Sequence, residues 1–166
     1  YLYKRQYEVS TYTSKPNCCN APTTKLALAT DAEAFTGNGT AHITVSGGNG
    51  KNITWNVKDD TNTAHDNYLS ATSNIGTTIT IPTAVATRTY TVTATQPDDN
   101  TDENNVICGA TAKVSISVKA QWTITFYTKD NGNVSEHNHI TVTDGDTYNM
   151  PDIADDYTCS NGATFA

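Results

Sequence analysis

Apolar and polar residues alternate in segment after segment between Thr23 and Lys119, and this period of two is the feature that most constrains the fold. Successive side chains of a β-strand point to opposite faces of a sheet, so the alternation indicates strands with one buried face. Turn signals such as Gly47-Gly48-Asn49-Gly50 and Asp59-Asp60-Thr61-Asn62 separate the segments. The pattern predicts seven strands, whose apolar positions are Leu26 and Leu28; Ala41, Ile43 and Val45; Ile53, Trp55 and Val57; Tyr68 and Leu69; Ile79 and Ile81; Tyr90, Val92 and Ala94; and Val114, Ile116 and Val118.

The composition favours the same class of structure. Its apolar residues are mostly Val, Ile, Ala and Tyr, and it has a single Met. Branched side chains restrict χ1 in a helix but suit a pleated sheet. A chain of 166 residues can hold two small domains. We therefore expect an all-β protein with a sandwich over residues 23–119 and a smaller module over residues 120–166, after an N-terminal extension or linker at residues 1–22.

The charge argues against two classes of partner. The formal net charge is −7, from 17 acidic and 10 basic residues, and no run of Lys or Arg interrupts it. Such a surface repels nucleic acid and anionic membranes. The longest apolar runs fall far short of the roughly 18 residues of a membrane span, and no leader peptide opens the sequence. We expect no membrane span, with any export signal or anchor outside this sequence.

The 23–119 region resembles the immunoglobulin-like sandwich. The resemblance is carried by Trp55 on the third strand, Tyr90 on the sixth, and the segments GTAHITVSGGNGKNITWNV and RTYTVTAT. Antibody domains have an inter-sheet cysteine pair where this chain has Ile43 or Val45 and Val92. This departure fits a bacterial Ig-like surface domain, whose core is held by packing alone.

The four cysteines are Cys18, Cys19, Cys108 and Cys159. An adjacent pair matches no zinc-ligand spacing, so disulfide chemistry is the better interpretation. In an Ig-like sandwich the Cys18-Cys19 pair precedes the first strand and Cys108 precedes the last, and those strands can run close together. We expect a Cys19–Cys108 disulfide, with Cys18–Cys108 as the alternative. Either bond favours an oxidising, extracellular compartment.

Residues 120–166 resemble a second family. The elements are, in order, a β-branched strand from Trp122, an Asn131-Gly132 turn, a second strand entering a Gly145-Asp146 turn, a Tyr-x-Met-Pro sequence, and Asn-Gly-x-x-Phe at the end. This order is similar to the internalin B-repeat, a small β-grasp-like module found in tandem on bacterial surface proteins. We expect its core to come from the apolar faces of the two strands, namely Trp122, Ile124 and Phe126 with Ile140 and Val142.

In the B-repeat family the final Phe is normally followed by Gly-Trp and one more strand, whereas this sequence stops at Ala166. The resemblance implies an incomplete module with an open sheet edge. Residues 1–9 are predicted to form an edge strand, and residues 10–22 are predicted to form a linker. Residues 1–9 are similar to the last strand of a preceding repeat, but a plain N-terminal extension is an equally good interpretation. Two outcomes are therefore expected as alternatives: strand exchange between copies, with residues 1–9 of one molecule completing another, or poor order of the residues after about Met150.

One acidic segment has the start of a calcium loop. Asp98, Asn100 and Asp102 place oxygen ligands at alternate positions. The match fails at its sixth position, which is Glu103 rather than Gly, and at its twelfth, which is Gly109 rather than Glu. A solvated loop between the sixth and seventh strands is the favoured interpretation, and we expect no metal and no cofactor.

His137 and His139 fall two apart on an expected strand, which would place both rings on one face about 7 Å apart. Two ligands do not make a structural zinc site, so we interpret them as an exposed polar face. The sequence has no GxSxG, phosphate-cradling or HExxH motif, and its carboxylates lie in hydrophilic turns. We therefore expect no enzymatic activity.

Aromatic residues can form sugar-stacking platforms. Trp55 and Trp122 lie at inward positions of their predicted strands, which favours core packing. The remaining candidates for an exposed row are Tyr1, Tyr3, Tyr7 and Tyr12.

These observations together predict a non-enzymatic segment of a secreted or cell-surface bacterial protein. It would act in adhesion or as a structural stalk, with an unidentified protein or glycan at the cell surface as its partner. The alternative is a carbohydrate-binding accessory module of a larger surface enzyme.

Overall fold

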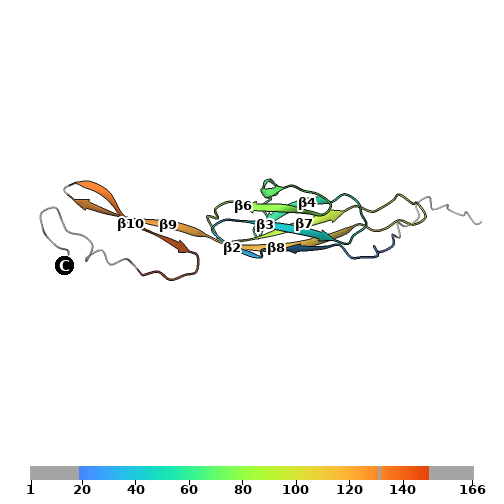
Figure 1. Ribbon diagram of the computed structural model, residues 1–166, viewed down its shortest axis with the longest axis horizontal. Helices are drawn as coiled ribbons and strands as arrows, with labels where there is room; N and C mark the ends of the chain where they lie inside the picture. Colours follow the sequence, from blue (N-terminus) through green and yellow to red (C-terminus); the bar gives the residue numbers. More distant parts are fainter. Residues whose placement is uncertain (1–18, 131, 150–166) are drawn as a thin grey trace, which may run out of the picture.

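Two four-stranded sheets form a β-sandwich, and a two-stranded hairpin continues from one end of it (Figure 1). The structure is a computed structural model that describes residues 19–130 and 132–149. Within these residues the regular structure is β apart from the short 3-10 helix η1 (Asp66–Tyr68). The predicted all-β class is therefore confirmed.

The first sheet has the order β1-β3-β6-β5, and all its neighbouring strands are antiparallel. Its strands are β1 (Ala27–Thr30), β3 (Gly39–Ser46), β6 (Gly76–Ile81) and β5 (Leu69–Ser70). Tyr68, expected to begin the fourth strand, instead closes η1, and the short strand begins at Leu69.

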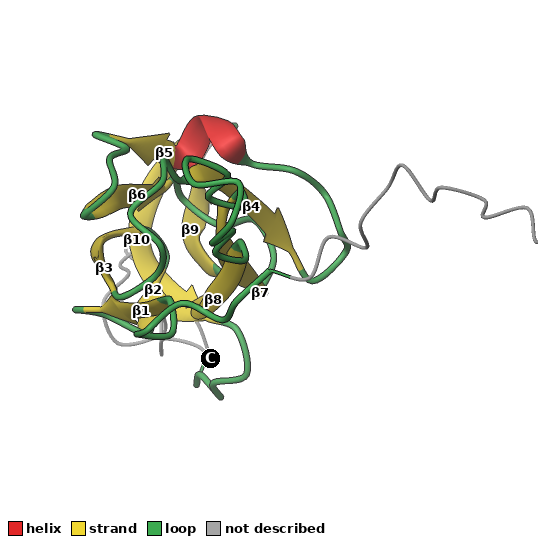
Figure 2. Ribbon diagram, turned by 90° about the vertical axis from the view of Figure 1, so that its right-hand side faces the viewer, coloured by secondary structure: helices red, strands yellow, loops and turns green. Residues whose placement is uncertain are grey.

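The second sheet has the order β2-β8-β7-β4 and carries the longest strands of the sandwich. Its members are β2 (Ala34–Thr36), β8 (Ala110–Lys119), β7 (Arg88–Gln96) and β4 (Thr54–Asp59). Figure 2 looks along the molecule and shows the two sheets as separate layers.

The core lies between the sheets and contains the residues that the alternation predicted. The completely buried side chains include Ile43 and Ile79 from the first sheet and Val57, Val92 and Ile116 from the second. Polar neighbours on the same strands, such as those in the exposed positions of β3, face solvent. The period of two therefore placed the buried and exposed faces correctly in these strands.

Trp55 and Tyr90 both lie on the core side, as expected from the sequence. Tyr90 is 6 % exposed, whereas Trp55 is partly buried and packs against the core cluster. The indole Nε1 of Trp55 donates a hydrogen bond to the Ser73 carbonyl over 3.1 Å, which satisfies its one polar group.

The sequence did not predict strand β2. It pairs in parallel with β8, through Ala34, Phe35 and Thr36. A three-residue strand is too short to show a period of two. The ring of Phe35 lies where a Cβ on Gly39 would be, since the two would approach to 2.3 Å, so a glycine at position 39 makes room for this edge strand.

The hairpin consists of β9 (Gln121–Asp130) and β10 (Asn133–Thr143). Trp122 pairs with Val142 and Ile124 with Ile140, so these four side chains share one face, as predicted. Within the described part of the module, however, these side chains do not form a closed core, because Trp122 and Ile124 are 43 % and 44 % exposed. Two strands alone cannot bury both sides of their apolar residues.

A second correction concerns the two histidines of β10. The pairing register shifts between Glu136 and Asn138, which places His137 in a bulge. The expectation that His137 and His139 share one face assumed an unbroken strand, and a bulge interrupts the alternation of side chains. The side chain of His137 lies outside the described residues, whereas His139 is exposed and its Nδ1 lies 3.2 Å from Glu136 Oε1.

Candidate functional site at the joint

The joint between sandwich and hairpin consists of one residue. Strand β8 ends at Lys119 and β9 begins at Gln121, so only Ala120 separates them. Ala120 is completely buried. The last strand of the sandwich thus passes almost directly into the hairpin, and the two parts extend along one axis (Figure 1).

Both backbone groups of Ala120, its amide and its carbonyl, form hydrogen bonds. Its amide donates to Thr87 Oγ1 over 3.0 Å, and its carbonyl accepts from the Asp144 amide over 2.9 Å. The Thr87 hydroxyl in turn donates to the Asp144 carboxylate. The loop before β7, the joint and the turn after β10 therefore form one hydrogen-bonded ring.

A second set of contacts supports the joint from the β2 side. The Gly37 amide donates to the Lys119 carbonyl over 2.9 Å, and the Ala84 amide donates to the Gly37 carbonyl over 2.8 Å. Gly37 has a φ of +78°, a conformation that favours glycine, and a Cβ there would lie 2.8 Å from the Gln121 side-chain oxygen. The backbone therefore packs closely at the point where the chain leaves the sandwich.

A shallow pocket of about 220 Å³ opens at the same end of the sandwich. Its wall combines aromatic, apolar and charged side chains: Asp59, His65, Tyr68, Pro82, Thr83, Ala84, Val85, Ala86, Arg88 and Tyr90. The segment 82–88 lines the pocket and also carries Thr87, so the pocket and the joint share a loop.

Three rings form an aromatic cluster in the pocket. The ring of His65 stacks on Tyr68 with centroids 4.8 Å apart, and it meets the edge of Tyr90 at 5.3 Å. Strand β7 places Tyr90 on its inward face, and η1 brings Tyr68 against it. Burial raises the pKa of the Tyr90 phenol above its usual range, with the Tyr68 and Asp59 charges adding to this effect.

Asp59 organises the polar side of the pocket. Its Oδ1 accepts hydrogen bonds from the Thr61 hydroxyl and amide and from the Thr63 amide, at 2.7, 3.0 and 2.9 Å, while its Oδ2 lies 3.1 Å from His65 Nε2. The bond from the Thr61 hydroxyl is the main reason that the pKa of Asp59 lies far below its usual range, and burial opposes it. The carboxylate is therefore ionised and its hydrogen-bonding capacity is largely occupied.

The opposite end of the sandwich carries the predicted disulfide. Cys19 and Cys108 are bonded, with their Cα atoms 4.9 Å apart. Asn20 forms a bridge with Ile107, and the Cys108 amide donates to the Asn20 carbonyl over 2.8 Å. The disulfide thus fastens the entering chain to the β7–β8 loop. Cys18 and Cys159 lie outside the described residues.

The carboxylates of the acidic loop are not arranged as ligands of a calcium site. Asp98 accepts from the Gly109 amide, and Asp102 accepts from the Asn104 amide. Lys51 links the loop to another segment, since its Nζ lies 2.8 Å from the Asp99 carboxylate and donates to Thr101 Oγ1 over 2.7 Å. Neither this loop nor any other part of residues 19–130 and 132–149 gathers three His, Cys, Asp or Glu side chains that could hold a metal ion. Asn100, the remaining calcium candidate, lies in the same exposed loop.

The hydrogen bond from Lys51, followed by those from Thr101, lowers the pKa of Asp99 from its usual value to about 2. Sequence reasoning identified the loop but missed this pair, since Lys51 lies far from it in the sequence. It also missed the pocket, whose rings come from two segments, the one around η1 and strand β7; the run of carboxylates at Asp59-Asp60 was an available signal.

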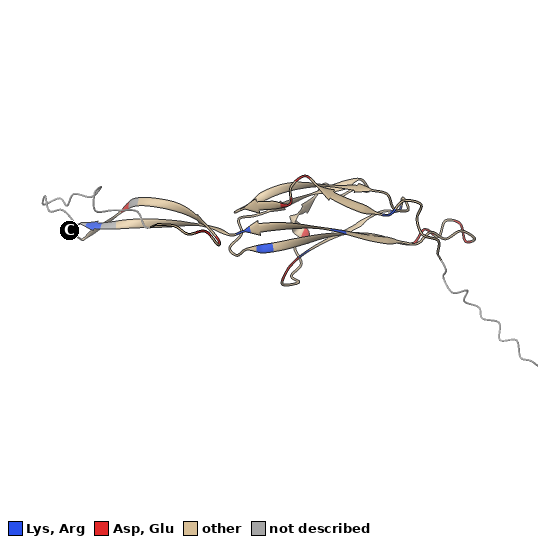
Figure 3. Cartoon of the chain, turned by 90° about the horizontal axis from the view of Figure 1, so that it is seen from below, with Lys and Arg blue, Asp and Glu red and all other residues tan. Residues whose placement is uncertain are grey.

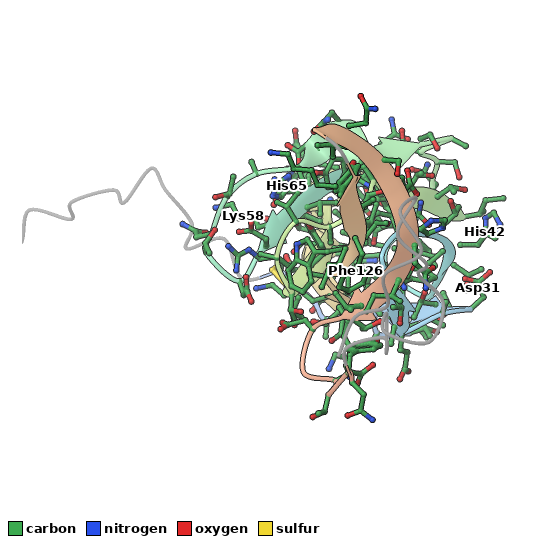
Figure 4. All side chains as sticks on the ribbon, turned by 90° about the vertical axis from the view of Figure 1, so that its left-hand side faces the viewer. Asp31, His42, Lys58, His65 and Phe126 are labelled. Atoms are coloured by element: carbon green, nitrogen blue, oxygen red, sulfur yellow. A yellow bond between two sulfur atoms is a disulfide. The ribbon has the colours of Figure 1, made fainter. Side chains whose placement is uncertain are left out.

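Among the described residues, charged residues lie more often in the loops than in the strands (Figure 3). Seen from the hairpin end, His65 and Lys58 lie on one side of the molecule and Asp31 and His42 on the other (Figure 4).

The candidate aromatic row of Tyr1, Tyr3, Tyr7 and Tyr12 lies outside the described residues. Among the residues that are described, no helix is long and apolar enough to cross a membrane.

No family model matches this sequence, and comparisons with curated proteins and with solved structures also gave no match.

Proposed function

We propose that the chain is a non-enzymatic segment of a secreted or cell-surface bacterial protein, in which it acts as a structural stalk or in adhesion. The observation that carries this proposal is the joint at Ala120, where a fully buried single residue connects the sandwich to the hairpin. A stalk must hold successive modules at a fixed angle, and a short, hydrogen-bonded joint favours that more than a flexible linker does.

The strand order supports an Ig-like assignment of the sandwich. In Ig-like domains the first, second, fifth and fourth strands share one sheet, as β1, β3, β6 and β5 do here. The other sheet pairs the last two long strands, β8 and β7, with β4. The hairpin likewise has the two strands and the turn expected for the start of a B-repeat-like module.

The disulfide and the sheet faces favour an extracellular location. A disulfide between Cys19 and Cys108 persists best in an oxidising compartment. On the outer face of the second sheet, hydroxyl pairs such as Thr91 with Ser115, at 3.4 Å, lie beside Lys58 and Lys113 and present a polar surface. A polar face of this kind suits a sheet that stays in contact with water.

The proposal is tested by replacing residues 23–149 in the full-length protein with a Gly/Ser linker of equal residue count. Antibodies against this segment should label intact cells of the source organism, and the linker variant should lose adhesion although it is still displayed. If the segment itself is adhesive, the purified segment will also compete with whole cells for binding, whereas a pure stalk will not compete. Absence of labelling on intact cells, or unchanged adhesion in the linker variant, would contradict the proposal.

A carbohydrate-binding accessory module is the second candidate function. The observation that favours it is the pocket between η1 and the 82–88 loop, where aromatic and apolar side chains meet hydrogen-bonding groups.

A further inference from the structure

We propose that the pocket formed by His65, Tyr68, Val85, Arg88 and Tyr90 binds a single neutral sugar residue. The site deepens the second candidate function and does not depend on the stalk role, because all its residues belong to the sandwich.

The hydroxyl of Tyr90 provides the first argument. The residue is only 6 % exposed, yet its hydroxyl makes no hydrogen bond to another described residue. No fully buried side-chain nitrogen or oxygen in the described part of the chain lacks a partner, so this hydroxyl must reach solvent. Tyr90 is one of the residues that line the pocket, and we infer that its hydroxyl meets solvent there. A buried residue with a free polar tip is typical of a binding site.

The neighbouring groups supply both donors and acceptors. Nε2 of His65 lies 3.1 Å from Asp59 Oδ2, which leaves Nδ1 of the ring as a second polar atom for a ligand. Nε of Arg88 is 4.0 Å from Asp59 Oδ2 and 3.7 Å from Asp60 Oδ1, too far for hydrogen bonds, and Nη1 donates to the Thr87 carbonyl over 3.4 Å, so the guanidinium retains other donors for a ligand. Sugar hydroxyls both donate and accept, which matches this mixture.

The other side of the pocket is apolar. Val85 is 84 % exposed at the rim, beside Pro82 and Ala86. One face of a pyranose ring presents C–H groups, and these pack on aromatic and aliphatic surfaces while the ring hydroxyls point outward. The apolar rim and the rings of His65 and Tyr68 together offer such a surface.

The charges of the pocket favour a neutral ligand. A carboxylate would be attracted by Arg88 but repelled by Asp59 and Asp60, and an ammonium group would be attracted by the two carboxylates but repelled by Arg88, so for a ligand charge of either sign these opposing interactions partly cancel. The volume of about 220 Å³ lies below the roughly 300–1,000 Å³ of pockets for drug-sized molecules, which restricts the ligand to about one ring.

The test is a titration of the isotope-labelled protein with glucose, galactose, mannose and N-acetylglucosamine, followed by amide chemical shifts. At least one of these sugars should shift the amides of residues 59–68 and 82–90 in a saturable way. Tyr90→Phe removes only the hydroxyl and should weaken that binding by about three- to tenfold, the usual range for one hydrogen bond. Tyr127→Phe makes the same chemical change at a residue that is 63 % exposed on the hairpin and should leave the affinity unchanged.

Thermal unfolding of both variants, matched to the parent protein, establishes that the fold is intact. The proposal is overturned if none of the four sugars shifts these amides, if the affinity is unchanged in Tyr90→Phe, or if glucuronate or glucosamine binds more tightly than every neutral sugar. Any of these results leaves the stalk role to be decided by the cell-based experiment.

Discussion

The hydroxyl of Thr87 donates a hydrogen bond to the carboxylate of Asp144, and this contact ties the loop before β7 to the turn after β10. The same Thr87 oxygen accepts the amide of Ala120, so one side chain connects the sandwich, the joint and the hairpin. A hydroxyl can serve both partners because it donates one hydrogen and accepts through its lone pairs.

Thr87→Val, which keeps the branched shape and removes the hydroxyl, should loosen the joint. The Ala120 amide then lacks its acceptor, and we expect its hydrogen exchange to become at least about tenfold faster, equivalent to about 1.4 kcal/mol. Thr89→Val is the matched control, since the Thr89 hydroxyl lies 3.5 Å from Ser117 on the outer face of the sheet. Equal exchange of Ala120 in both variants would show that Thr87 does not fasten the joint.

The disulfide should contribute roughly 4 to 5 kcal/mol to stability, because it closes a loop with a sequence separation of 89 residues. Chemical denaturation with and without reductant measures this difference, and Cys108→Ser should reproduce the reduced value. Peptide mapping without reductant should recover the Cys19–Cys108 pair. Recovery of Cys108 as a free thiol, or bonded to Cys159, would rule the assignment out.

The two tryptophans should differ sharply in their contribution to stability. Trp55 packs on the core and donates to Ser73, so we expect Trp55→Ala to cost about 3 kcal/mol, the lower end for a large aromatic residue. Trp122 is 43 % exposed on the hairpin, and Trp122→Ala should change unfolding of the sandwich by less than about 1 kcal/mol. Denaturant midpoints decide the matter, and similar losses for both variants would mean that Trp55 does not belong to the core.

Acid should weaken the contact between Lys51 and Asp99. The folded-state pKa of Asp99, about 2, lies below the ordinary value of 3.8, so the ionised carboxylate stabilises the fold above pH 3.8. This contribution is lost as the pH falls through about 2. Asp99→Asn should therefore flatten the pH dependence of the unfolding midpoint in that window, whereas Glu103→Gln in the same loop should leave it steep. A parallel pH dependence in parent and Asp99→Asn would refute this role.

Alternation in the sequence was enough to predict the sandwich core, because a period of two directly encodes which face of a strand is buried. It predicted Ile43, Ile79 and Val92 as core residues, and all three are completely buried. The edge strand at Phe35 was missed, since three residues are too few for a periodic signal.

The candidate site was less accessible to prediction, for a different reason. Asp59, Tyr68 and Tyr90 come from three segments, and only the pairing of β4 with β7 and the placement of η1 bring them together. Thr87 and Asp144 are likewise 57 residues apart, with no local pattern that links them. Contacts of this kind follow from tertiary packing and not from the spacing of residue types.

Residual dipolar couplings measured in one aligned sample test the central claim, that the sandwich and hairpin form one stiff unit. Amide couplings from β3, β7 and β8 report the orientation of the sandwich, and those from β9 and β10 report that of the hairpin. If the joint at Ala120 is stiff, both sets will fit one alignment tensor with the orientation seen in the structure. Two tensors of different magnitude, with a smaller one for the hairpin, would show that the hairpin moves freely and would contradict the account.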